Sequence, residues 1–350
     1  MVGGVETHVA ALAVRLAARG HEVEVLTQQK VRGVTSIERI EGVTVRRFPL
    51  ALPEPIYALT PGIWRYLRQH GARYDLVHAH SYHAFPALFT ALAGRHPLVL
   101  TPHYHGGGHM PLGRALHVPY RRALGSLMLG RADAIICVSH SEAALLLRHF
   151  PAAANRISVI PNGVDVAAVR GVQPFPDQQK HLILSAGRLA AYKGVDRVLG
   201  ALARLDDRFE LCVIGDGPAR ADLEAVAARL GVKARVHFLG QVDQAQLYRW
   251  YRTAAVYASL SSQEAFGMTV LEALAAGAAV IASDIPAHRE VLRMAGPVRA
   301  ALVPVDVPSA EVAAAMQAMA DNPPGTRERP DIRSWDDVVQ QTLMVYDALL

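Results

Sequence analysis

Residues 259–283 read SLSSQEAFGMTVLEALAAGAAVIAS. The apolar run before them, residues 254–258, predicts a strand, and Met268 to Ala276 predict a short helix that ends at Gly277 and leads into a second strand. A loop that enters a helix after a strand directs unpaired backbone N–H groups, and the positive end of the helix dipole, at a ligand above the sheet edge. The stretch therefore predicts an α/β chain with an anion site, most naturally for phosphate.

Two glutamates lie in this stretch, Glu264 in the loop and Glu272 in the first turns of the helix. We expect both to face the same crevice at different depths. Carboxylates beside a phosphate would repel it, but they can accept hydrogen bonds from the hydroxyls that flank the phosphates of a nucleotide sugar. The alternative stays open that Glu264 only solvates the loop and that Glu272 only supports the helix start.

This stretch resembles the E-x7-E signature of the retaining glycosyltransferases of family 4. The resemblance covers nearly the whole chain and is strongest from Val159 to Glu290. It implies that Glu264 contacts the donor sugar, with a catalytic role, and that Glu272 contacts the ribose. It also implies that sugar and pyrophosphate are held by the backbone amides of four donor-binding residues, Phe266, Gly267, Met268 and Thr269.

The length of the chain, 350 residues, exceeds what one hydrophobic core usually supports, so two domains are expected. Strands that alternate with helices predict parallel sheets. The resemblance implies a GT-B architecture, an α/β fold in which two Rossmann-like doubly wound parallel-sheet domains face each other across a cleft. We expect an N-terminal acceptor-side domain over residues 1–165, a C-terminal nucleotide-sugar-binding domain over 175–328, and a C-terminal helix over 329–350 that crosses back to the N-terminal domain.

Two cations follow the strand that opens the second domain. Arg188 and Lys193 lie five residues apart on a glycine-bounded turn after His181–Ala186. In that arrangement they can clamp a pyrophosphate from two sides. They could instead be two surface charges. Their place directly after a strand, and their match to an Arg and Lys pair in the family, favour donor binding.

Histidines gather after two predicted strands of the first domain. They are His78, His80 and His83, then His103, His105 and His109. A zinc site is the alternative, but no cysteine or carboxylate pattern completes it. The resemblance implies instead that His103 is a catalytic residue near the acceptor, with His105 a lesser candidate. We expect His78 and His80 to be structural residues at the strand end or residues of the site's wall.

The N-terminus departs from the family pattern. Gly3 and Gly4 lead directly into a helical pattern that ends at Gly20, whereas in the family a strand precedes the paired glycines. That first strand, apparently missing, would lie centrally in the sheet, so its absence would leave unpaired backbone groups on two neighbouring strands. The resemblance places Gly4 at the cleft among the donor-binding residues. A misplaced start, a truncation and an impaired N-terminal domain stay open as explanations.

Composition narrows the class of protein. With 51% hydrophobic and 19% charged residues the chain is not disordered, and no apolar run approaches the length of a membrane span, so a cytoplasmic location is expected. The basic helical pattern over 114–130 leaves peripheral contact with the inner face of a membrane open, with an ordinary surface helix as the alternative. The net charge of +5 suits anionic ligands, but no nucleic-acid module is present. Cys137 and Cys212 are expected to be buried and free.

These observations, with the resemblance, predict a retaining hexosyltransferase. It would move a sugar from a nucleotide-diphosphate sugar, most naturally GDP- or UDP-linked, to a hydroxyl of a glycan or lipid-linked acceptor in cell-envelope polysaccharide, glycolipid or glycoconjugate synthesis. No cofactor and no metal are expected, because fixed cations and helix-end amides would stabilise the leaving group. The alternative is a non-catalytic nucleotide-sugar-binding or partner protein with an impaired N-terminal domain. The base, the sugar and the acceptor do not follow from the sequence.

Overall fold

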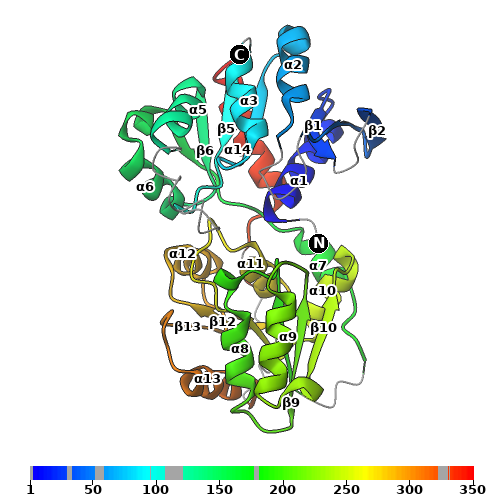
Figure 1. Ribbon diagram of the computed structural model, residues 1–350, viewed down its shortest axis with the longest axis vertical. Helices are drawn as coiled ribbons and strands as arrows, with labels where there is room; N and C mark the ends of the chain where they lie inside the picture. Colours follow the sequence, from blue (N-terminus) through cyan, green and yellow to red (C-terminus); the bar gives the residue numbers. More distant parts are fainter. Residues whose placement is uncertain are drawn as a thin grey trace. The chain divides into compact units, whose positions relative to one another are not determined.

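The computed structural model describes residues 3–29, 34–51, 59–94, 96–106, 121–176, 181–321, 330 and 332–350, with only the backbone described at 121–122. The chain divides into two compact units (Figure 1). The C-terminal unit is Gly163–Ser334, and the N-terminal unit is Gly4–Asn162 together with Trp335–Leu350. Each unit is an α/β layer structure with its own hydrophobic core.

One parallel sheet forms the centre of the C-terminal unit. Its strands are β8 (His181–Ala186), β9 (Phe209–Ile214), β10 (Val236–Gly240), β11 (Val256–Ser259), β12 (Ala279–Ser283) and β13 (Ala300–Val303). Their order is β10-β9-β8-β11-β12-β13, and every neighbouring pair is parallel. The order reverses between β8 and β11. In a doubly wound sheet that reversal leaves a crevice outside the carboxyl ends of the two strands, where ligands bind.

Helices cover both faces of this sheet. They are α7 (Val166–Gly171), α8 (Val195–Leu202), α9 (Arg220–Arg229), α10 (Gln244–Thr253), α11 (Met268–Ala275), α12 (Pro286–Ala295) and α13 (Ser309–Asp321). Apolar residues of α8, α9 and α13 share one core with the strands, and α8 and α9 are seen in front of the sheet in Figure 1. Helices α7, α10, α11 and α12 contact one another in series. The predicted helix over 268–276 is α11, one residue shorter.

The strands of the N-terminal unit form two sheets. They are β1 (Glu24–Gln29), β2 (Ser36–Ile40), β3 (Val43–Pro49), β4 (Val77–His80), β5 (Leu98–Thr101), β6 (Ala134–Cys137) and β7 (Ile157–Val159). One sheet has the order β1-β3-β2, with β2 antiparallel, and the other is the parallel β4-β5-β6-β7. Among the described residues, β1 and β4 are edge strands that no further strand joins. The expectation that a central first strand is missing from this unit stays a prediction. Strand β2 was not predicted.

Helices of the N-terminal unit pack on these sheets. They are α1 (Gly4–Ala18), α2 (Pro61–His70), α3 (Phe85–Ala93), α5 (Ser126–Arg131), α6 (His140–His149) and α14 (Trp335–Asp347), with a wider π-type turn at Arg121–Gly125. The C-terminal helix α14 belongs to this unit and contacts α1. Its Tyr346 hydroxyl lies 2.7 Å from Nδ1 of His78, and Nε2 of that ring lies 2.7 Å from Oγ1 of Thr101. His78 is therefore structural in this unit, as expected from the sequence.

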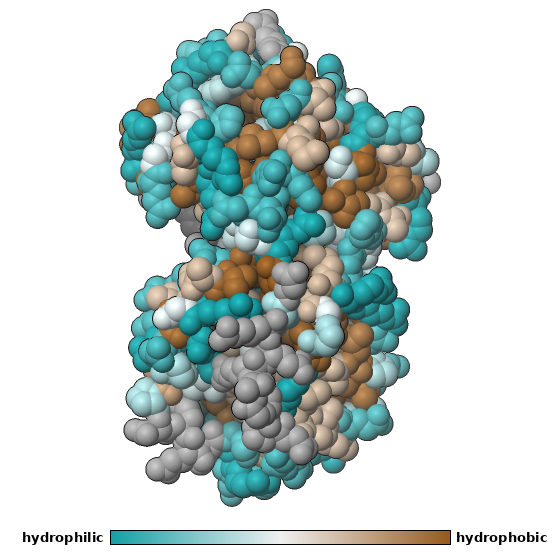
Figure 2. All heavy atoms as spheres, turned by 180° about the vertical axis from the view of Figure 1, so that it is seen from behind, coloured by the Kyte–Doolittle hydropathy of each residue, from teal (hydrophilic) through white to brown (hydrophobic). Residues whose placement is uncertain are grey.

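Short helical turns connect several of these elements. They lie at Gly71–Arg73, Pro151–Arg156, Ala191–Lys193 and Lys233–Arg235. Residues 114–120 of the basic pattern over 114–130 lie outside the described residues, as do 177–179 of the polar, proline-bearing stretch 173–179, which the sequence suggests as a linker between the domains. The face drawn in Figure 2 shows polar residues interspersed with separate groups of apolar ones. No helix in the described ranges combines the length and the apolar character needed to cross a membrane.

Candidate functional site

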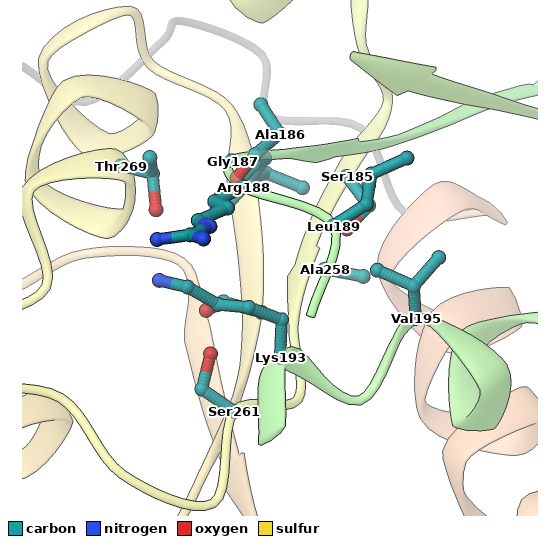
Figure 3. Close-up of a pocket in the computed structure, with 12 residues that line it drawn as sticks. Ser185, Ala186, Gly187, Arg188, Leu189, Lys193, Val195, Ala258, Ser261 and Thr269 are labelled. Atoms are coloured by element: carbon teal, nitrogen blue, oxygen red, sulfur yellow. Dashed lines mark hydrogen bonds between the residues drawn. The ribbon is translucent and has the colours of Figure 1, made fainter. Parts of the chain in front are cut away.

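A pocket opens in the C-terminal unit at the carboxyl ends of β8 and β11, where the strand order reverses (Figure 3). It is lined by Ser185, Ala186, Gly187, Arg188, Leu189, Lys193, Val195, Tyr257, Ala258, Ser259, Ser261 and Thr269. Three of the residues predicted to bind the donor, Arg188, Lys193 and Thr269, thus lie around one space. Their side chains come from the loop after β8 and from the first turn of α11.

The two predicted cations differ in their surroundings. Lys193 donates from Nζ to Oε1 of Glu264 at 2.6 Å. Burial disfavours the charge of Lys193, but the carboxylate beside it raises its pKa, so the ammonium stays protonated. Arg188 is exposed and has no hydrogen-bond or ion-pair partner among the described residues. Figure 3 shows its guanidinium pointing into the space that the Lys193 amino group also faces, which leaves its donors available to an anion.

A glycine brings the turn with Lys193 against the loop after β11. Gly194 has φ +66°, and a Cβ there would lie 2.2 Å from the carbonyl oxygen of Leu260. No other residue could be accommodated without moving that backbone. The close approach allows the amide of Ser262 to donate to the carbonyl of Tyr192 at 2.8 Å. The two loops that carry Lys193 and Glu264 are therefore fastened to each other.

Glu264 lies in the loop before α11, as predicted. Its Oε1 accepts from Lys193 and, at 2.8 Å, from the hydroxyl of Ser261. Burial alone would raise the pKa of this carboxyl, but the charge and hydrogen bond of Lys193 outweigh burial and lower it. Oε2 accepts no hydrogen bond from the described residues. Glu264 is thus an ionised carboxylate with one oxygen held and one available to a hydroxyl.

Glu272 is the fifth residue of α11 and is 6% exposed. Its Oε2 accepts a hydrogen bond from the hydroxyl of Tyr251 on α10 at 3.1 Å. Burial raises the pKa of Glu272 to about 7, and the tyrosine bond offsets part of that rise. Glu272 is not one of the residues that line the pocket, whereas Tyr257 does line it. The charges of Glu264 and Glu272 both contribute to raising the pKa of Tyr257.

The start of α11 is shaped by Gly267, which has φ +106° and forms the N-cap without a side-chain cap. A Cβ on this glycine would come 3.2 Å from Cδ2 of His288. Phe266 is buried and Met268 partly buried, and neither lines the pocket. Of the four residues from 266 to 269, Thr269 alone lines it.

His288 on α12 is a residue that the motif reasoning missed. It is fully buried, and its Nδ1 lies 2.8 Å from the carbonyl oxygen of Ser283. Burial lowers its pKa, although Glu264 acts in the opposite direction. The Ser283 hydroxyl in turn donates to the carbonyl of Ser261, whose own hydroxyl holds Glu264. His288 therefore helps to hold the loop of Glu264 through Ser283. In the sequence, only its place in the segment after β12 that resembles the family could have indicated this role.

In the N-terminal unit, His103 follows β5 with φ +48°, a left-handed backbone conformation that is uncommon outside glycine. Its ring lies edge-on to that of His8, with centroids 5.2 Å apart, and is stacked with that of His80 at 5.8 Å. Nε2 of His103 and Nδ1 of His80 are buried, and neither has a hydrogen-bond partner among the described residues. His8 is held by Asn162, with Nδ1 2.7 Å from Oδ1.

Burial keeps this histidine cluster, His8, His78, His80 and His103, uncharged. It lowers the pKa of His8 to about 4 and that of His78 to about 3, and it lowers the pKa values of the other two well below the usual range. In the described ranges no group of three or more His, Cys, Asp or Glu side chains is arranged to hold a metal ion. His109 lies outside those ranges. Gly4 is exposed and opens α1, with nothing within 4 Å of the position of a Cβ.

Parallel α/β units with a basic pocket at the point where strand order reverses define a class of proteins that bind phosphate-bearing ligands at the carboxyl ends of their strands. Residues 2–168 match the family model described as Glycosyltransferase Family 4, and residues 171–333 match the one described as Glycosyl transferases group 1. The chain belongs to the group 1 glycosyltransferases of family 4 type, and it is a glycosyltransferase. The predicted family is confirmed.

Curated relatives agree with this assignment. The chain is 31% identical over 332 residues to a D-inositol 3-phosphate glycosyltransferase of Streptomyces scabiei, which covers 81% of this chain and 71% of that protein. It is 30% identical over 372 residues to the phosphatidyl-myo-inositol mannosyltransferase of Mycobacterium tuberculosis, which covers 99% of this chain and 93% of that protein.

Solved structures share the fold. Sucrose-phosphate synthase from Thermosynechococcus elongatus has a TM-score of 0.77 at 22% identity and covers 99% of this chain and 94% of its own. HepE of Anabaena, solved in complex with UDP and glucose, has a TM-score of 0.77 at 20% identity and covers 100% of this chain and 97% of its own. These likenesses confirm the predicted GT-B fold.

Proposed function

We propose that this glycosyltransferase uses a nucleotide-diphosphate sugar as donor and transfers the sugar to a hydroxyl acceptor with retention of anomeric configuration. The observation that carries the proposal is that Lys193, which lines the pocket together with Arg188, contacts Glu264 at 2.6 Å. Lys193, a cation for a pyrophosphate, is thus in direct contact with an ionised carboxylate for a sugar hydroxyl. A nucleotide sugar presents phosphate and hydroxyl groups at a similarly short separation.

In this proposal the negative charge that develops on the leaving nucleotide is stabilised by Arg188, Lys193 and the first amides of α11. Fixed donors in a partly buried pocket stabilise such charge more strongly than water does, because they need no reorganisation during the reaction. The positive end of the α11 dipole acts in the same direction. These groups perform the role that a metal ion has in other transferases, so we expect activity without an added metal.

The two glutamates have separate roles in this proposal. Glu264, ionised beside Lys193, accepts from a hydroxyl of the donor sugar through its available oxygen and holds the sugar next to the leaving phosphate. Glu272 accepts from the ribose hydroxyls. Retention of configuration is proposed from the E-x7-E signature shared with family 4.

The acceptor is proposed to bind at the N-terminal unit, with His103 as the residue that contacts it and Gly4 nearby. Nε2 of His103, which is buried and has no partner within the described ranges, supports this role, because a buried polar atom without a partner is costly unless a ligand satisfies it. Inositol-bearing acceptors are the first to test, because two relatives at 30% identity or more are named for inositol phosphate and phosphatidyl-inositol.

Calorimetric titration with a panel of UDP-, GDP- and ADP-linked hexoses tests the donor, with Glu272→Ala as the weakened variant. We expect saturable binding of one donor, loss of affinity in the variant, and, with that donor and an inositol acceptor in the presence of EDTA, a product whose anomeric proton shows the donor's configuration. Folded protein that binds no nucleotide sugar, or a product of inverted configuration, would contradict the proposal.

A further inference from the structure

The hydrogen bond between Tyr251 and Glu272 joins two buried side chains from different helices. Tyr251 lies on α10 and is fully buried, and Glu272 lies on α11. The tyrosine hydroxyl donates to Oε2 of Glu272 at 3.1 Å. Oε1 of Glu272 receives no hydrogen bond from the described residues. One carboxylate oxygen is thus held by the protein, and the other remains for a ligand.

The partner of this carboxylate is unusual because it is neutral. Buried carboxylates are normally paired with a cation, since an unpaired buried charge is costly. In the part of the chain that the structure describes, no Lys, Arg or His side chain lies within 4.0 Å of Glu272. The ionisable groups that face it are Tyr251 on α10 and Tyr257 on β11. On α12 the buried His288 is directed at Ser283 and Ser259, and on α7 Arg170 donates to the Ala275 carbonyl.

Tyr251 is itself fixed in place. Its ring meets that of Tyr257 edge to face, with centroids 5.3 Å apart and planes at 68°. The hydroxyl of Tyr257 donates to the carbonyl of Ala186 at 3.2 Å, at the carboxyl end of β8. The position of the Tyr251 hydroxyl is therefore tied through packed rings to the strand end that borders the donor pocket.

We propose that Tyr251 is a positioning residue for the donor, holding one oxygen of the Glu272 carboxylate so that the other accepts from the ribose hydroxyls. This proposal rests on the proposed function and names the residue that orients its ribose contact. Burial raises the pKa of Glu272 to about 7 and so favours the neutral carboxyl. The hydrogen bond from Tyr251 acts in the opposite direction and favours the charged carboxylate, which is the better acceptor for a ribose hydroxyl.

The test compares nucleoside diphosphates with and without ribose hydroxyls. The full chain is titrated calorimetrically with UDP, GDP and ADP, each beside its 2′,3′-dideoxy analogue, and the ratio of the two dissociation constants is recorded for each pair. In the wild type we expect the dideoxy analogue of the preferred base to bind about tenfold more weakly or worse, the range for hydrogen bonds to a charged group. In Tyr251→Phe we expect that ratio to fall by about threefold or more, with affinity for the dideoxy analogue nearly unchanged.

Tyr248→Phe is the matched control, because Tyr248 is a buried tyrosine of the same helix that does not line the pocket. Its ratio should equal that of the wild type. If Tyr248→Phe lowers the ratio as much as Tyr251→Phe does, or if Tyr251→Phe weakens both analogues equally, the effect is one of packing and the proposal is overturned.

A second variant is needed if Tyr251→Phe does not fold, because that change leaves a buried carboxylate without a donor. Glu272→Gln removes the charge, so the double variant Tyr251→Phe/Glu272→Gln is expected to fold and to show the ratio of Glu272→Gln alone. A further loss in the double variant would mean that Tyr251 does not act through Glu272. A wild type that binds no diphosphate, or binds each pair equally, would instead contradict the proposed function itself.

Discussion

The two units place opposite chemistry at the carboxyl ends of their parallel strands. In the C-terminal unit, Arg188 and Lys193 line one pocket, and Glu264 forms an ion pair with Lys193. In the N-terminal unit, the histidine cluster is buried and uncharged, and one ring nitrogen each of His80 and His103 has no partner in the part of the chain that the structure describes. The ends of parallel strands therefore carry a charged pocket in one unit and a buried, uncharged histidine cluster in the other. The side chains that follow the strands decide the chemistry.

The largest expected effect is that of Lys193→Ala. It removes a cation from the donor pocket and leaves Glu264 without its partner, so transfer should fall by about 10²–10³-fold in kcat/KM, the range for loss of a fixed transition-state donor. Steady-state kinetics with saturating acceptor measure it. Lys233→Ala, an exposed lysine of the same unit, is the control and should change nothing. Equal activity of Lys193→Ala and Lys233→Ala would show that the charge of Lys193 does not contribute to catalysis.

His103→Ala should sharpen the difference between the units. Transfer is expected to fall by about 10²-fold, in the range for loss of a positioned acid or base, while the dissociation constant of the donor stays unchanged. Calorimetry and a transfer assay on the same preparation give both quantities. His21→Ala, an exposed histidine of the same unit, serves as the control. A parallel loss of donor affinity would show that the histidine cluster is not specific to the acceptor side.

The units should also respond to pH in opposite directions. His8 has a folded pKa of about 4 against 6.5 when unfolded, so its contribution is complete above pH 6.5 and is lost as pH falls toward 4. Glu272 has a folded pKa of about 7 against 4.5, so it weakens the fold above pH 7 and this cost is relieved as pH falls. For Glu272 the difference corresponds to about 3 kcal/mol as an upper bound.

Hydrogen exchange at pH 7.5 and pH 5.0, corrected for intrinsic rates, measures this response unit by unit. We expect faster exchange around β4, β5 and α1 at pH 5.0, and equal or slower exchange around α10 and α11. Glu272→Gln should remove the response of α10 and α11 and leave that of the N-terminal unit intact. Destabilisation of both units together on acidification would break the distinction between them.

The smallest expected effect is that of Tyr346→Phe, which removes the hydroxyl that holds His78. One buried hydrogen bond is worth about 1 kcal/mol, so the N-terminal unit should lose about that much free energy of unfolding. Urea unfolding, monitored by hydrogen exchange of the amides in the N-terminal unit, measures this loss of stability. Met344→Ala is the control, because Met344 is on the same helix and 67% exposed, and it should change stability by less than about 0.5 kcal/mol. If Met344→Ala lowered the free energy of unfolding as much as Tyr346→Phe does, the contact of the Tyr346 hydroxyl with His78 would contribute no stability.

Local patterns predicted the elements that carry the donor pocket well. Strand β8 lies at the predicted residues, β11 (Val256–Ser259) begins two residues later than the predicted 254–258 and ends one residue later, and α11 ends one residue early. Each is a short apolar run or a helix stopped by glycine, so the signal is within the segment itself. Strand β2 was missed because all five of its residues are exposed, which leaves no alternation of buried and exposed positions to read.

The sequence by itself determined the family, the two parallel-sheet units and the residue types that a donor site needs, because these are written in local runs and spacings. Only the tertiary structure decided which atoms meet. These contacts join segments that are far apart or separated by turns. They are the hydrogen bonds of Lys193 and Ser261 to Glu264, the hydrogen bond of Tyr251 to Glu272, and the close approach of the buried His288 ring to Gly267. Spacing along the chain does not encode such contacts, since they arise when strands and helices from different segments pack into one core.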